Sequence, residues 1–284
     1  MWSVRQLIAE GEILPFLQSD WRYAAYAIAD LEPWFFEQCR WWLAEDSEVG
    51  ERRLESDGPQ GVETNPVRGW GLLLLFDGLE PPAVFAQGDP DGVAALLDQV
   101  VLPDRVYFTA RPQHWPLVEE RCCLEFANRM MRMALAAEDF RASSSDAVRR
   151  LGTADLGAVQ TLYRLGKSGD ADGFAPFQVE RGVFFGSSED GRLVSVAGTH
   201  VVSLRHGLAA VGNVFTHPAF RGRGHALACT SAVTANLLEQ GLNVVLNVAV
   251  RNKAAASLYR RLGYRTYCRF FEGVGASKRS TARS

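Results

Sequence analysis

The stretch Val214-Phe215-Thr216-His217-Pro218-Ala219-Phe220-Arg221-Gly222-Arg223-Gly224-His225-Ala226 decides the fold of this chain. An apolar run at 212–216 ends at a proline, and a turn dense in arginine and glycine then leads into a helical pattern. A helix that begins in such a turn leaves several backbone N–H groups unpaired at the positive end of its dipole. Glycine at 222 and 224 removes the Cβ atoms that would keep a phosphate away from the backbone. The segment therefore predicts an anion site, and a diphosphate suits it best.

This turn differs from other phosphate-binding loops. It lacks the Lys-Ser/Thr pair that ends a P-loop, and it lacks the three-glycine spacing and the later acidic residue of a dinucleotide fingerprint. Its own pattern is Arg-x-x-Gly-x-Ala, carried by Arg221, Gly224 and Ala226 directly after the expected strand. That pattern resembles the acyl-CoA loop of the GNAT superfamily of N-acetyltransferases, which reads Arg/Gln-x-x-Gly-x-Gly/Ala.

A second stretch, residues 247–264, resembles another signature of the same superfamily. Asn252 precedes a helical segment with the pattern Ala-x-x-Leu-Tyr, which ends in Tyr259, and the segment closes on Leu262-Gly263-Tyr264. The two signatures stand in the superfamily's order, separated by one expected helix and one expected strand. The resemblance is specific over residues 147–272, and its wording leans toward the glycine N-acyltransferase-like branch.

Length and composition fit a soluble protein of two domains. The chain has 284 residues, of which 47% are hydrophobic and 22% are charged. It has no run of about 18 apolar residues, and its first residues lack the order of a secretory signal, so we expect a cytoplasmic protein without membrane contact. The five cysteines are odd in number and are not spaced as metal ligands, so we expect reduced thiols and no metal.

The charge changes sign along the chain. Residues 1–144 carry 24 acidic and 12 basic side chains, a balance of −12, whereas residues 145–284 carry 9 and 18, a balance of +9. All seven tryptophans lie in the first part. We therefore predict a first domain at 1–142, a second at 146–273 and a disordered tail at 274–284. A basic second domain suits a polyphosphate ligand, and its dispersed basic residues do not favour nucleic acid.

Hydrophobic periodicity in the second domain predicts alternating strands and helices. We expect strands at 147–152, 183–186, 193–202, 208–216, 243–248 and 264–271, helices at 153–165, 176–181, 224–240 and 253–262, and a loop at 167–173. That order is the GNAT order. The resemblance implies an α/β (α+β) acyl-CoA N-acyltransferase fold with a mixed, mostly antiparallel central sheet. In that fold, the strands at 208–216 and 243–248 separate at their far ends and the pantetheine arm lies between them.

The first domain gives weaker signals. We expect strands at 69–76, 83–86 and 105–110, helices at 91–100 and 117–121, and a strand or a helix at 124–135. This pattern loosely resembles a degenerate GNAT half that lacks the Arg-x-x-Gly-x-Gly/Ala loop. The aromatic stretch from Trp34 to Trp42 has helical spacing, and it could pack in the core or line an acceptor pocket.

The resemblance implies direct transfer of an acyl group from a CoA thioester to an amine, in four tasks. Backbone N–H groups of Arg221, Gly222, Arg223, Gly224, His225 and Ala226 would hold the diphosphate. A backbone N–H near Val214, Phe215 or Thr216 would polarise the thioester carbonyl. Tyr259 matches the superfamily's tyrosine acid for the leaving thiolate, and its alternative is a core tyrosine. Asn252 would contact the cofactor arm or simply cap its helix.

The fourth task is to accept a proton from the amine. Several GNAT enzymes place a glutamate on the strand before the loop, but residues 208–214 contain no carboxylate. His200 has a suitable pKa range if it faces the cleft, although a structural role is the alternative. Glu180 acting through water, or an amine that arrives neutral, would also serve. We expect His217 to be structural, and Asn213 either orients the acceptor or stitches the strand.

The sequence thus predicts a cytoplasmic acyl-CoA-dependent N-acyltransferase, a monomer or a homodimer. Acetyl-CoA is the expected co-substrate, and the acceptor is a small amine or an amino acid. Two alternatives stay open. One is a non-catalytic module that binds or senses acyl-CoA, suggested by the missing strand glutamate. The other is a protein-modifying acetyltransferase whose first domain docks the target.

Overall fold

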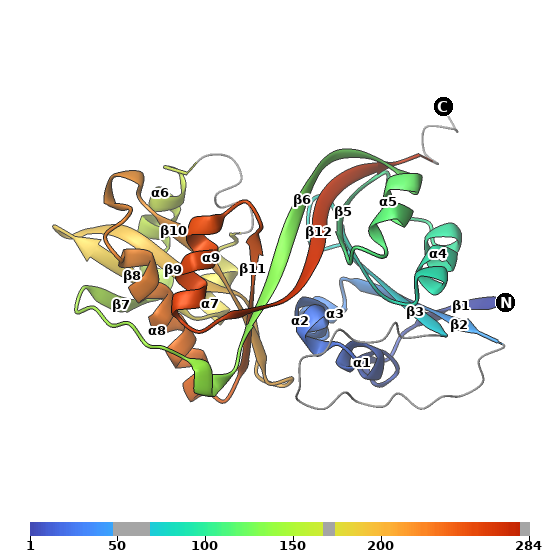
Figure 1. Ribbon diagram of the computed structural model, residues 1–284, viewed down its shortest axis with the longest axis horizontal. Helices are drawn as coiled ribbons and strands as arrows, with labels where there is room; N and C mark the ends of the chain where they lie inside the picture. Colours follow the sequence, from blue (N-terminus) through green and yellow to red (C-terminus); the bar gives the residue numbers. More distant parts are fainter. Residues whose placement is uncertain (48–68, 167–173, 279–284) are drawn as a thin grey trace. The chain divides into compact units, whose positions relative to one another are not determined.

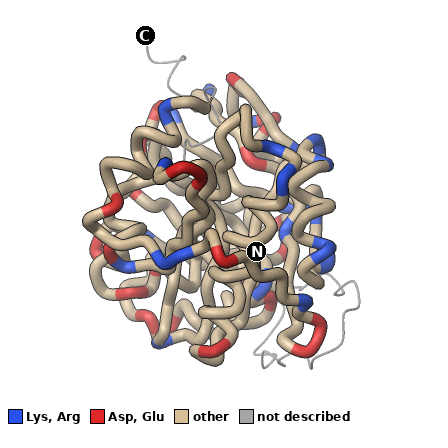
Figure 2. Tube along the Cα trace, turned by 90° about the vertical axis from the view of Figure 1, so that its left-hand side faces the viewer, with Lys and Arg blue, Asp and Glu red and all other residues tan. Residues whose placement is uncertain are grey.

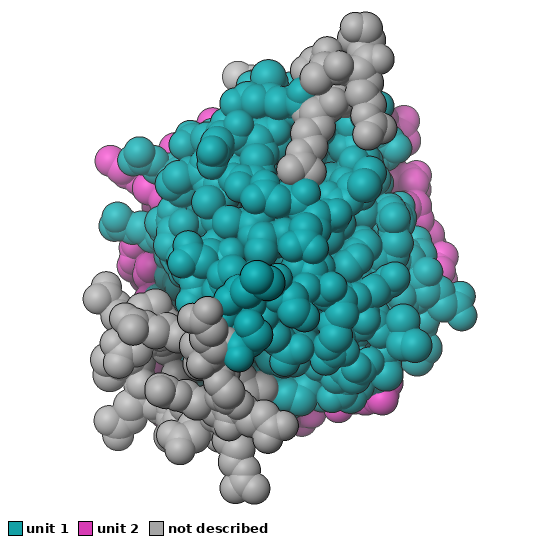
Figure 3. All heavy atoms as spheres, turned by 90° about the vertical axis from the view of Figure 1, so that its right-hand side faces the viewer, with its two compact units in different colours: residues 1–131, 267–284 teal, residues 132–266 magenta. Residues whose placement is uncertain are grey.

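The computed structural model describes residues 1–47, 69–166 and 174–278 and divides into two compact units. Unit 1 comprises Met1–Met131 together with Tyr267–Ser284, and unit 2 comprises Arg132–Thr266 (Figure 3). Both units combine a sheet with helices (Figure 1). The loop predicted at 167–173 lies outside the described residues.

Unit 2 contains a sheet in the order β11-β10-β9-β8-β7, which is antiparallel except between β10 and β11. This arrangement confirms the predicted fold class. In chain order the elements are β7 (Val148–Leu151), η2 (Thr153–Asp155), α6 (Leu156–Tyr163), α7 (Phe177–Arg181), β8 (Phe184–Glu189), β9 (Arg192–Ser203), β10 (Leu208–Thr216), η3 (Pro218–Phe220), α8 (His225–Glu239), β11 (Asn243–Ala249) and α9 (Lys253–Arg261). Unit 2 also contains η1 (Ala137–Asp139).

The core of unit 2 lies on both faces of its central strands. Consecutive residues of β9, from Val194 to Thr199, are all buried, so helices must cover the two faces to which they alternate. Helix α8 packs across β8, β9 and β10, while α6 packs against β9 and β10. The Asp190-Gly191 turn joins β8 to β9, and both residues have positive φ, as a two-residue hairpin requires.

Unit 1 repeats this plan with seven strands in its described residues, in the order β1-β2-β3-β4-β5-β12-β6. Its β4 and β5 form a parallel pair joined by α4, just as α8 joins β10 to β11. The elements are β1 (Trp2–Leu7), α1 (Glu10–Gln18), α2 (Trp21–Ala29), α3 (Pro33–Phe36), β2 (Cys39–Asp46), β3 (Trp70–Phe76), β4 (Ala83–Gly88), α4 (Pro90–Gln99), β5 (Arg105–Ala110), α5 (Trp115–Arg121), β6 (Cys122–Leu135) and β12 (Arg265–Ser277).

The helical interpretation of the aromatic stretch from Trp34 to Trp42 is wrong. Helix α3 ends at Phe36, and Trp41 and Trp42 lie on β2. Trp41 is 1% exposed and Trp42 is half-buried, because neighbouring strand residues face opposite sides of a sheet. Phe35 and Trp41 are buried, which agrees with core packing for these two side chains.

The structure divides the chain at places that the sequence did not indicate. The boundaries lie inside β6, after Met131, and inside β12, after Thr266, rather than at 142–146. Residues 274–277 complete β12, so the prediction of a tail from 274 is wrong for them, and residues 279–284 lie outside the described residues. A long strand that passes from one unit to the other has no turn or compositional break to mark the crossing.

We predict that unit 1 requires the C-terminal strand. A chain that ends at Arg269 loses the pairing of Phe271–Ala276 with Arg105–Ala110, together with buried Phe270 and Val274. Unit 1 should then unfold at a clearly lower urea concentration, followed by fluorescence because all seven tryptophans lie in unit 1. A chain that ends at Lys278 is the matched control and should behave as the full chain. An unchanged midpoint in the shorter chain would contradict the assignment of this strand to unit 1.

Candidate functional site

Strands β10 and β11 pair along only part of their length. The parallel register joins Leu208–Val211 to Asn243–Leu246, and the register then stops, although β10 continues to Thr216 and β11 to Ala249. Backbone N–H and C=O groups along these unpaired ends are available to a ligand. This is the separation that the resemblance predicted.

A bulge at Asn213 accompanies the separation. The register of β10 with β9 shifts between Gly212 and Phe215, and Asn213 has a φ of 53°, in the left-handed region. Its C=O accepts a hydrogen bond from the Tyr163 hydroxyl at 2.5 Å. Its side-chain amide donates to Gln178 Oε1 at 3.0 Å and to the Thr199 carbonyl at 3.1 Å. Of the two alternatives for Asn213, these contacts favour the structural role, in which the side chain holds the strand in place.

The residues that hold this bulge, Tyr163 and Gln178, were missed by sequence reasoning. Both are buried, and neither belongs to a motif. The available signal was the Gly212-Asn213 pair inside an otherwise apolar strand, which is typical of a bulge. A bulge exposes backbone groups that need partners, but the sequence does not say which distant side chain supplies them.

His200 lies against the same bulge. A Cβ atom at Gly212 would come within 2.3 Å of the imidazole ring, so only glycine fits there. Burial, together with the positive charge of Arg132, lowers the pKa of His200 to about 4. The ring is therefore neutral at pH 7, and its Nε2 accepts a hydrogen bond from the Asn213 backbone N–H at 3.3 Å. This lone pair is already engaged in positioning the strand.

The loop before α8 presents backbone donors to solvent. Gly222 and Gly224 have φ values of 80° and 91°, and a Cβ atom at either position would point into open space. Gly224 is the N-cap of α8, and no side chain caps this end. Within the described part of the chain, nothing accepts a hydrogen bond from the backbone N–H groups of residues 222–226. These consecutive donors at a helix N-terminus have the arrangement that an anion needs.

Side chains around the loop are partly engaged. Arg221 Nε donates to the Thr216 carbonyl at 3.2 Å, which ties the loop to the end of β10. The Glu189 carboxylate contacts both Arg223 and His225. His217 Nδ1 accepts from the Ala219 backbone N–H at 3.1 Å, an arrangement that shapes the turn and fits the structural role expected for it.

Helix α9 carries Asn252 and Tyr259. Asn252 Oδ1 accepts the Ala255 backbone N–H at 3.1 Å, so this side chain caps the helix. Tyr259 is buried, and burial raises its pKa to about 12, so the phenol keeps its proton at pH 7. None of the described residues hydrogen-bonds to its hydroxyl, whereas the hydroxyl of neighbouring Tyr264 bonds to Thr234 at 2.8 Å. The Tyr259 hydroxyl is thus available to a ligand.

The predicted site residues fall into two groups, and in the described part of the chain hydrogen bonds connect the residues within the first group but do not connect it to the second. Residues 214–226 form one continuous end of unit 2, and His200 joins it through Asn213. Asn252 and Tyr259 come from α9, and within the described residues no hydrogen bond connects their side chains to β10. Glu180, on α7, is exposed.

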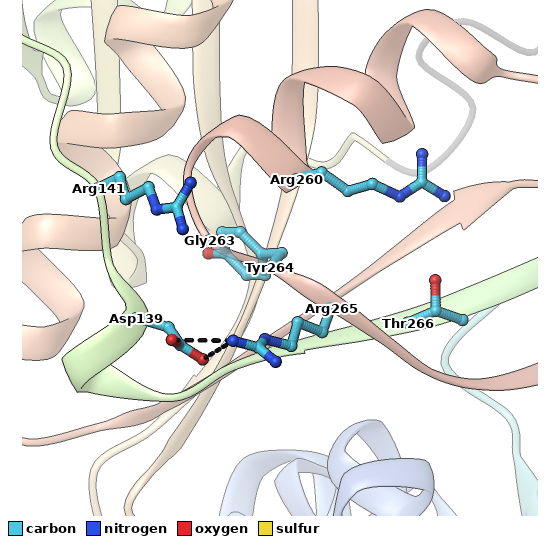
Figure 4. A pocket seen from close by; sticks show the side chains of 7 residues that line it. All are labelled: Asp139, Arg141, Arg260, Gly263, Tyr264, Arg265 and Thr266. Carbon is cyan, nitrogen blue, oxygen red and sulfur yellow. Dashed lines mark hydrogen bonds and ion pairs between the residues drawn. The ribbon is translucent and has the colours of Figure 1, made fainter.

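A cavity of about 360 Å³ lies elsewhere in unit 2, at the C-terminal end of α9 (Figure 4). In Figure 4 the Arg260 side chain extends away from Arg141, and Arg265 pairs with Asp139 at 3.0 Å, so the arginines do not converge on one point. None of the predicted site residues lines this cavity. Its lining residues are Asp139, Arg141, Arg260, Gly263, Tyr264, Arg265 and Thr266.

The corresponding helix of unit 1 begins differently. Asp89 is the N-cap of α4, its carboxylate accepts the Asp91 backbone N–H at 3.0 Å, and Pro90 follows at the first helical position. A carboxylate already occupies this helix end and would repel an anion. Strand β4, which precedes this helix, also has a backbone carbonyl in use, because that of Ala86 accepts a hydrogen bond from the Tyr23 hydroxyl at 3.3 Å. Of the two helix starts, the one in unit 2 is therefore the better candidate for an anion site.

Two further features of the described residues concern other kinds of site. In residues 1–47, 69–166 and 174–278, the His, Cys, Asp and Glu side chains form no group of three or more that could hold a metal ion. The same ranges contain no helix that combines the length and the apolar character needed to cross a membrane. Basic and acidic positions are scattered along the trace among other residues (Figure 2).

Comparisons with known proteins agree with this geometry. The profile of the FR47-like protein family matches residues 194–271. The fold is similar to a GCN5-related N-acetyltransferase from Kribbella flavida (20% identity, covering 76% of this chain and 89% of that chain, TM-score 0.54). It is also similar to one from Sphaerobacter thermophilus (15% identity, 96% and 95% covered, TM-score 0.58).

A third similar structure is a tandem GNAT protein from the clavulanic acid biosynthesis pathway (14% identity, 97% and 98% covered, TM-score 0.55). No curated protein matches the chain in sequence. The matched structures confirm the GNAT fold, and the tandem protein agrees with two GNAT-like domains, while the glycine N-acyltransferase-like branch stays a prediction.

We predict that His200 makes unit 2 sensitive to acid. Its folded pKa of about 4 lies below the ordinary value of 6.5, so its contribution to stability is complete above pH 6.5 and is lost as the pH falls toward 4. The loss is at most about 3 kcal/mol. His200→Gln can still accept the Asn213 N–H but does not titrate, so its unfolding free energy should fall less between pH 7 and pH 4.5.

Hydrogen exchange of β9 and β10 peptides measures this difference in unit 2. Buried His114 provides an internal control, because burial also lowers its pKa to about 4 and it lies in unit 1. Tryptophan fluorescence should therefore show the same acid loss of unit 1 in both proteins. Equal acid loss of unit 2 in both would refute the assignment to His200.

Proposed function

We propose that this two-domain protein with the GNAT fold transfers an acyl group, in the first instance acetyl, from acyl-CoA to a primary amine of a small molecule or an amino acid. One observation carries the proposal. The backbone N–H groups of residues 222–226, which have no acceptor among the described residues, lie directly after a strand whose end is unpaired with its parallel neighbour. The diphosphate of coenzyme A needs the loop N–H groups, and its extended pantetheine arm needs the unpaired strand end next to them.

The backbone would bind most of the cofactor. The diphosphate accepts hydrogen bonds from the loop, and Gly222 and Gly224 allow its oxygens to approach. The pantetheine arm hydrogen-bonds along the unpaired end of β10 as an added strand would. This placement brings the thioester carbonyl near Val214, Phe215 and Thr216, where a fixed N–H stabilises the developing oxyanion by a few kcal/mol.

Tyr259 would serve the leaving group. The amine nitrogen attacks the thioester carbon, and the new C–N bond forms as the C–S bond breaks. The sulfur leaves as a thiolate, which needs a strong hydrogen bond as it forms and then takes a proton from water. A phenol with a pKa of about 12 is a weaker acid than a thiol with an ordinary pKa of about 8.5. Full transfer is therefore uphill unless the same burial also raises the thiol pKa. We assign to Tyr259 a hydrogen bond to the sulfur that strengthens as negative charge develops.

The amine would lose its proton to water. Strand β10 has no carboxylate, and the Nε2 lone pair of His200 already accepts the Asn213 N–H. An acceptor that enters as the neutral amine needs no protein base before attack. We therefore assign His200 a positioning role, and Glu180 stays the alternative that acts through water.

Calorimetry with coenzyme A tests binding, and release of free CoA thiol from acetyl-CoA with a panel of amines tests transfer. No binding would refute the proposal. Tight binding without release for any small amine or amino acid would favour the non-catalytic acyl-CoA module. Mass shifts on lysate proteins would favour protein modification.

We predict that Gly224→Ala weakens coenzyme A binding about tenfold. At a φ of 91°, alanine costs about 1–2 kcal/mol, and relief of this strain turns the loop N–H groups away from the anion. Calorimetry measures the change. Gly157→Ala, inside α6 where a Cβ atom meets nothing within 4 Å, is the matched control and should bind as the unsubstituted protein does. Unchanged affinity in Gly224→Ala would contradict the loop assignment.

We predict that Tyr259→Phe lowers kcat about 10- to 100-fold and leaves coenzyme A affinity nearly intact, because the hydroxyl acts mainly in the transition state. Steady-state release of CoA thiol measures kcat. Tyr264→Phe is the matched control: it removes a hydroxyl that bonds to Thr234 and should cost about 1 kcal/mol of stability with little effect on turnover. A kcat of Tyr259→Phe equal to that of the unsubstituted protein would contradict the role of Tyr259 at the leaving sulfur.

A further inference from the structure

The carboxylate of Glu189 connects two side chains of the anion loop. Its Oε1 lies 2.8 Å from His225 Nε2, and its Oε2 lies 3.1 Å from Arg223 Nη1. Glu189 ends β8, and the tight turn of Asp190 and Gly191 fixes its position. A negative charge from another strand thus stands beside N–H groups that are arranged for an anion.

The two contacts of Glu189 differ in burial. The His225 side chain is 11% exposed, and its Nδ1 lies 2.9 Å from the hydroxyl of Ser187, which is itself buried. The Arg223 side chain is 55% exposed, and its other hydrogen bond, to the Ala219 carbonyl, is long at 3.4 Å. Exposed ion pairs are weak and exchange partners easily. The contact with His225 is therefore the fixed one, and the contact with Arg223 is the exchangeable one.

Arginine has a stronger alternative partner once the loop is occupied. A guanidinium binds a phosphate through two parallel N–H groups, and a diphosphate on the loop would carry more charge than one carboxylate. Arg223 leaves the backbone between Gly222 and Gly224, next to the N–H groups that would hold that diphosphate. Glu189 and the diphosphate would thus compete for the guanidinium of Arg223.

We propose that Glu189 holds Arg223 away from the diphosphate and so weakens cofactor binding, an inference that rests on the proposed function. When coenzyme A binds, Arg223 transfers from Glu189 to the phosphate oxygens, while Glu189 stays on His225. When the product leaves, Glu189 recaptures the guanidinium. Glu189 is a positioning residue that favours release of CoA, a step that limits turnover in many enzymes.

A double-mutant cycle tests the competition. Calorimetry with coenzyme A at low ionic strength compares the unsubstituted protein, Glu189→Gln, Arg223→Gln and the double variant. Glutamine keeps a hydrogen bond to His225 but does not hold a guanidinium, so Glu189→Gln should tighten binding about fivefold. In the Arg223→Gln background the same change should alter binding less than about twofold. High salt should reduce the fivefold gain.

Asp190→Asn is the matched control. It removes the same charge from the next residue, which is exposed and contacts neither Arg223 nor His225, and it should change binding less than about twofold. Glu189→Gln binding that is equal to or weaker than that of the unsubstituted protein overturns the inference. Equal tightening in both backgrounds also overturns it, since that result means direct repulsion of the phosphate. If the unsubstituted protein binds no coenzyme A, the proposed function fails and the inference with it.

Discussion

The departure of β10 from β11 after Val211 is the constraint on which the candidate site depends. Two strands that stayed paired would satisfy each other's backbone groups and leave no edge for an extended ligand. The bulge at Asn213 accompanies the departure, and the side chains of Tyr163, His200 and Gln178 hydrogen-bond to its carbonyl, its N–H and its amide. These groups would otherwise be unsatisfied in the interior, so the contacts fix the geometry of the opening before any ligand arrives.

The two units show how one architecture gives different chemistry. Each joins a parallel strand pair through a helix, α4 in unit 1 and α8 in unit 2. In unit 1 the helix begins with Asp89 and Pro90, so a carboxylate accepts the Asp91 N–H and proline supplies no N–H of its own. In unit 2 the two positive-φ glycines leave those groups pointing outward. The difference lies in a few residues of one turn, which is why fold similarity alone does not assign a site to unit 1.

The sequence predicted unit 2 well because its signals are local. Strand β10 has the expected bounds, and α8 and α9 differ from expectation by a residue or so at each end, since glycine and Asn252 mark helix ends in the sequence itself. It failed where a property depends on distant partners. The lone pair of His200 is engaged because Gly212 lets the ring approach the Asn213 N–H, which no local pattern shows. The sequence also does not show that β6 and β12 each pass from one unit to the other, because the residue pattern of a strand does not change at a unit boundary.

The charge balance of +9 over residues 145–284 suggested attraction of a polyphosphate, but contacts at the loop count for more. Charges separated by more than about 8 Å are largely screened at physiological salt. Several arginines of unit 2 are also paired locally, Arg149 with Asp155 and Arg265 with Asp139. What distinguishes the loop is therefore a set of N–H groups that cannot titrate and that have no hydrogen-bond acceptor among the described residues. In our proposal Glu189, which contacts the Arg223 and His225 side chains, adjusts the charge beside these groups, so that one local carboxylate influences anion affinity more than the total charge of the unit does.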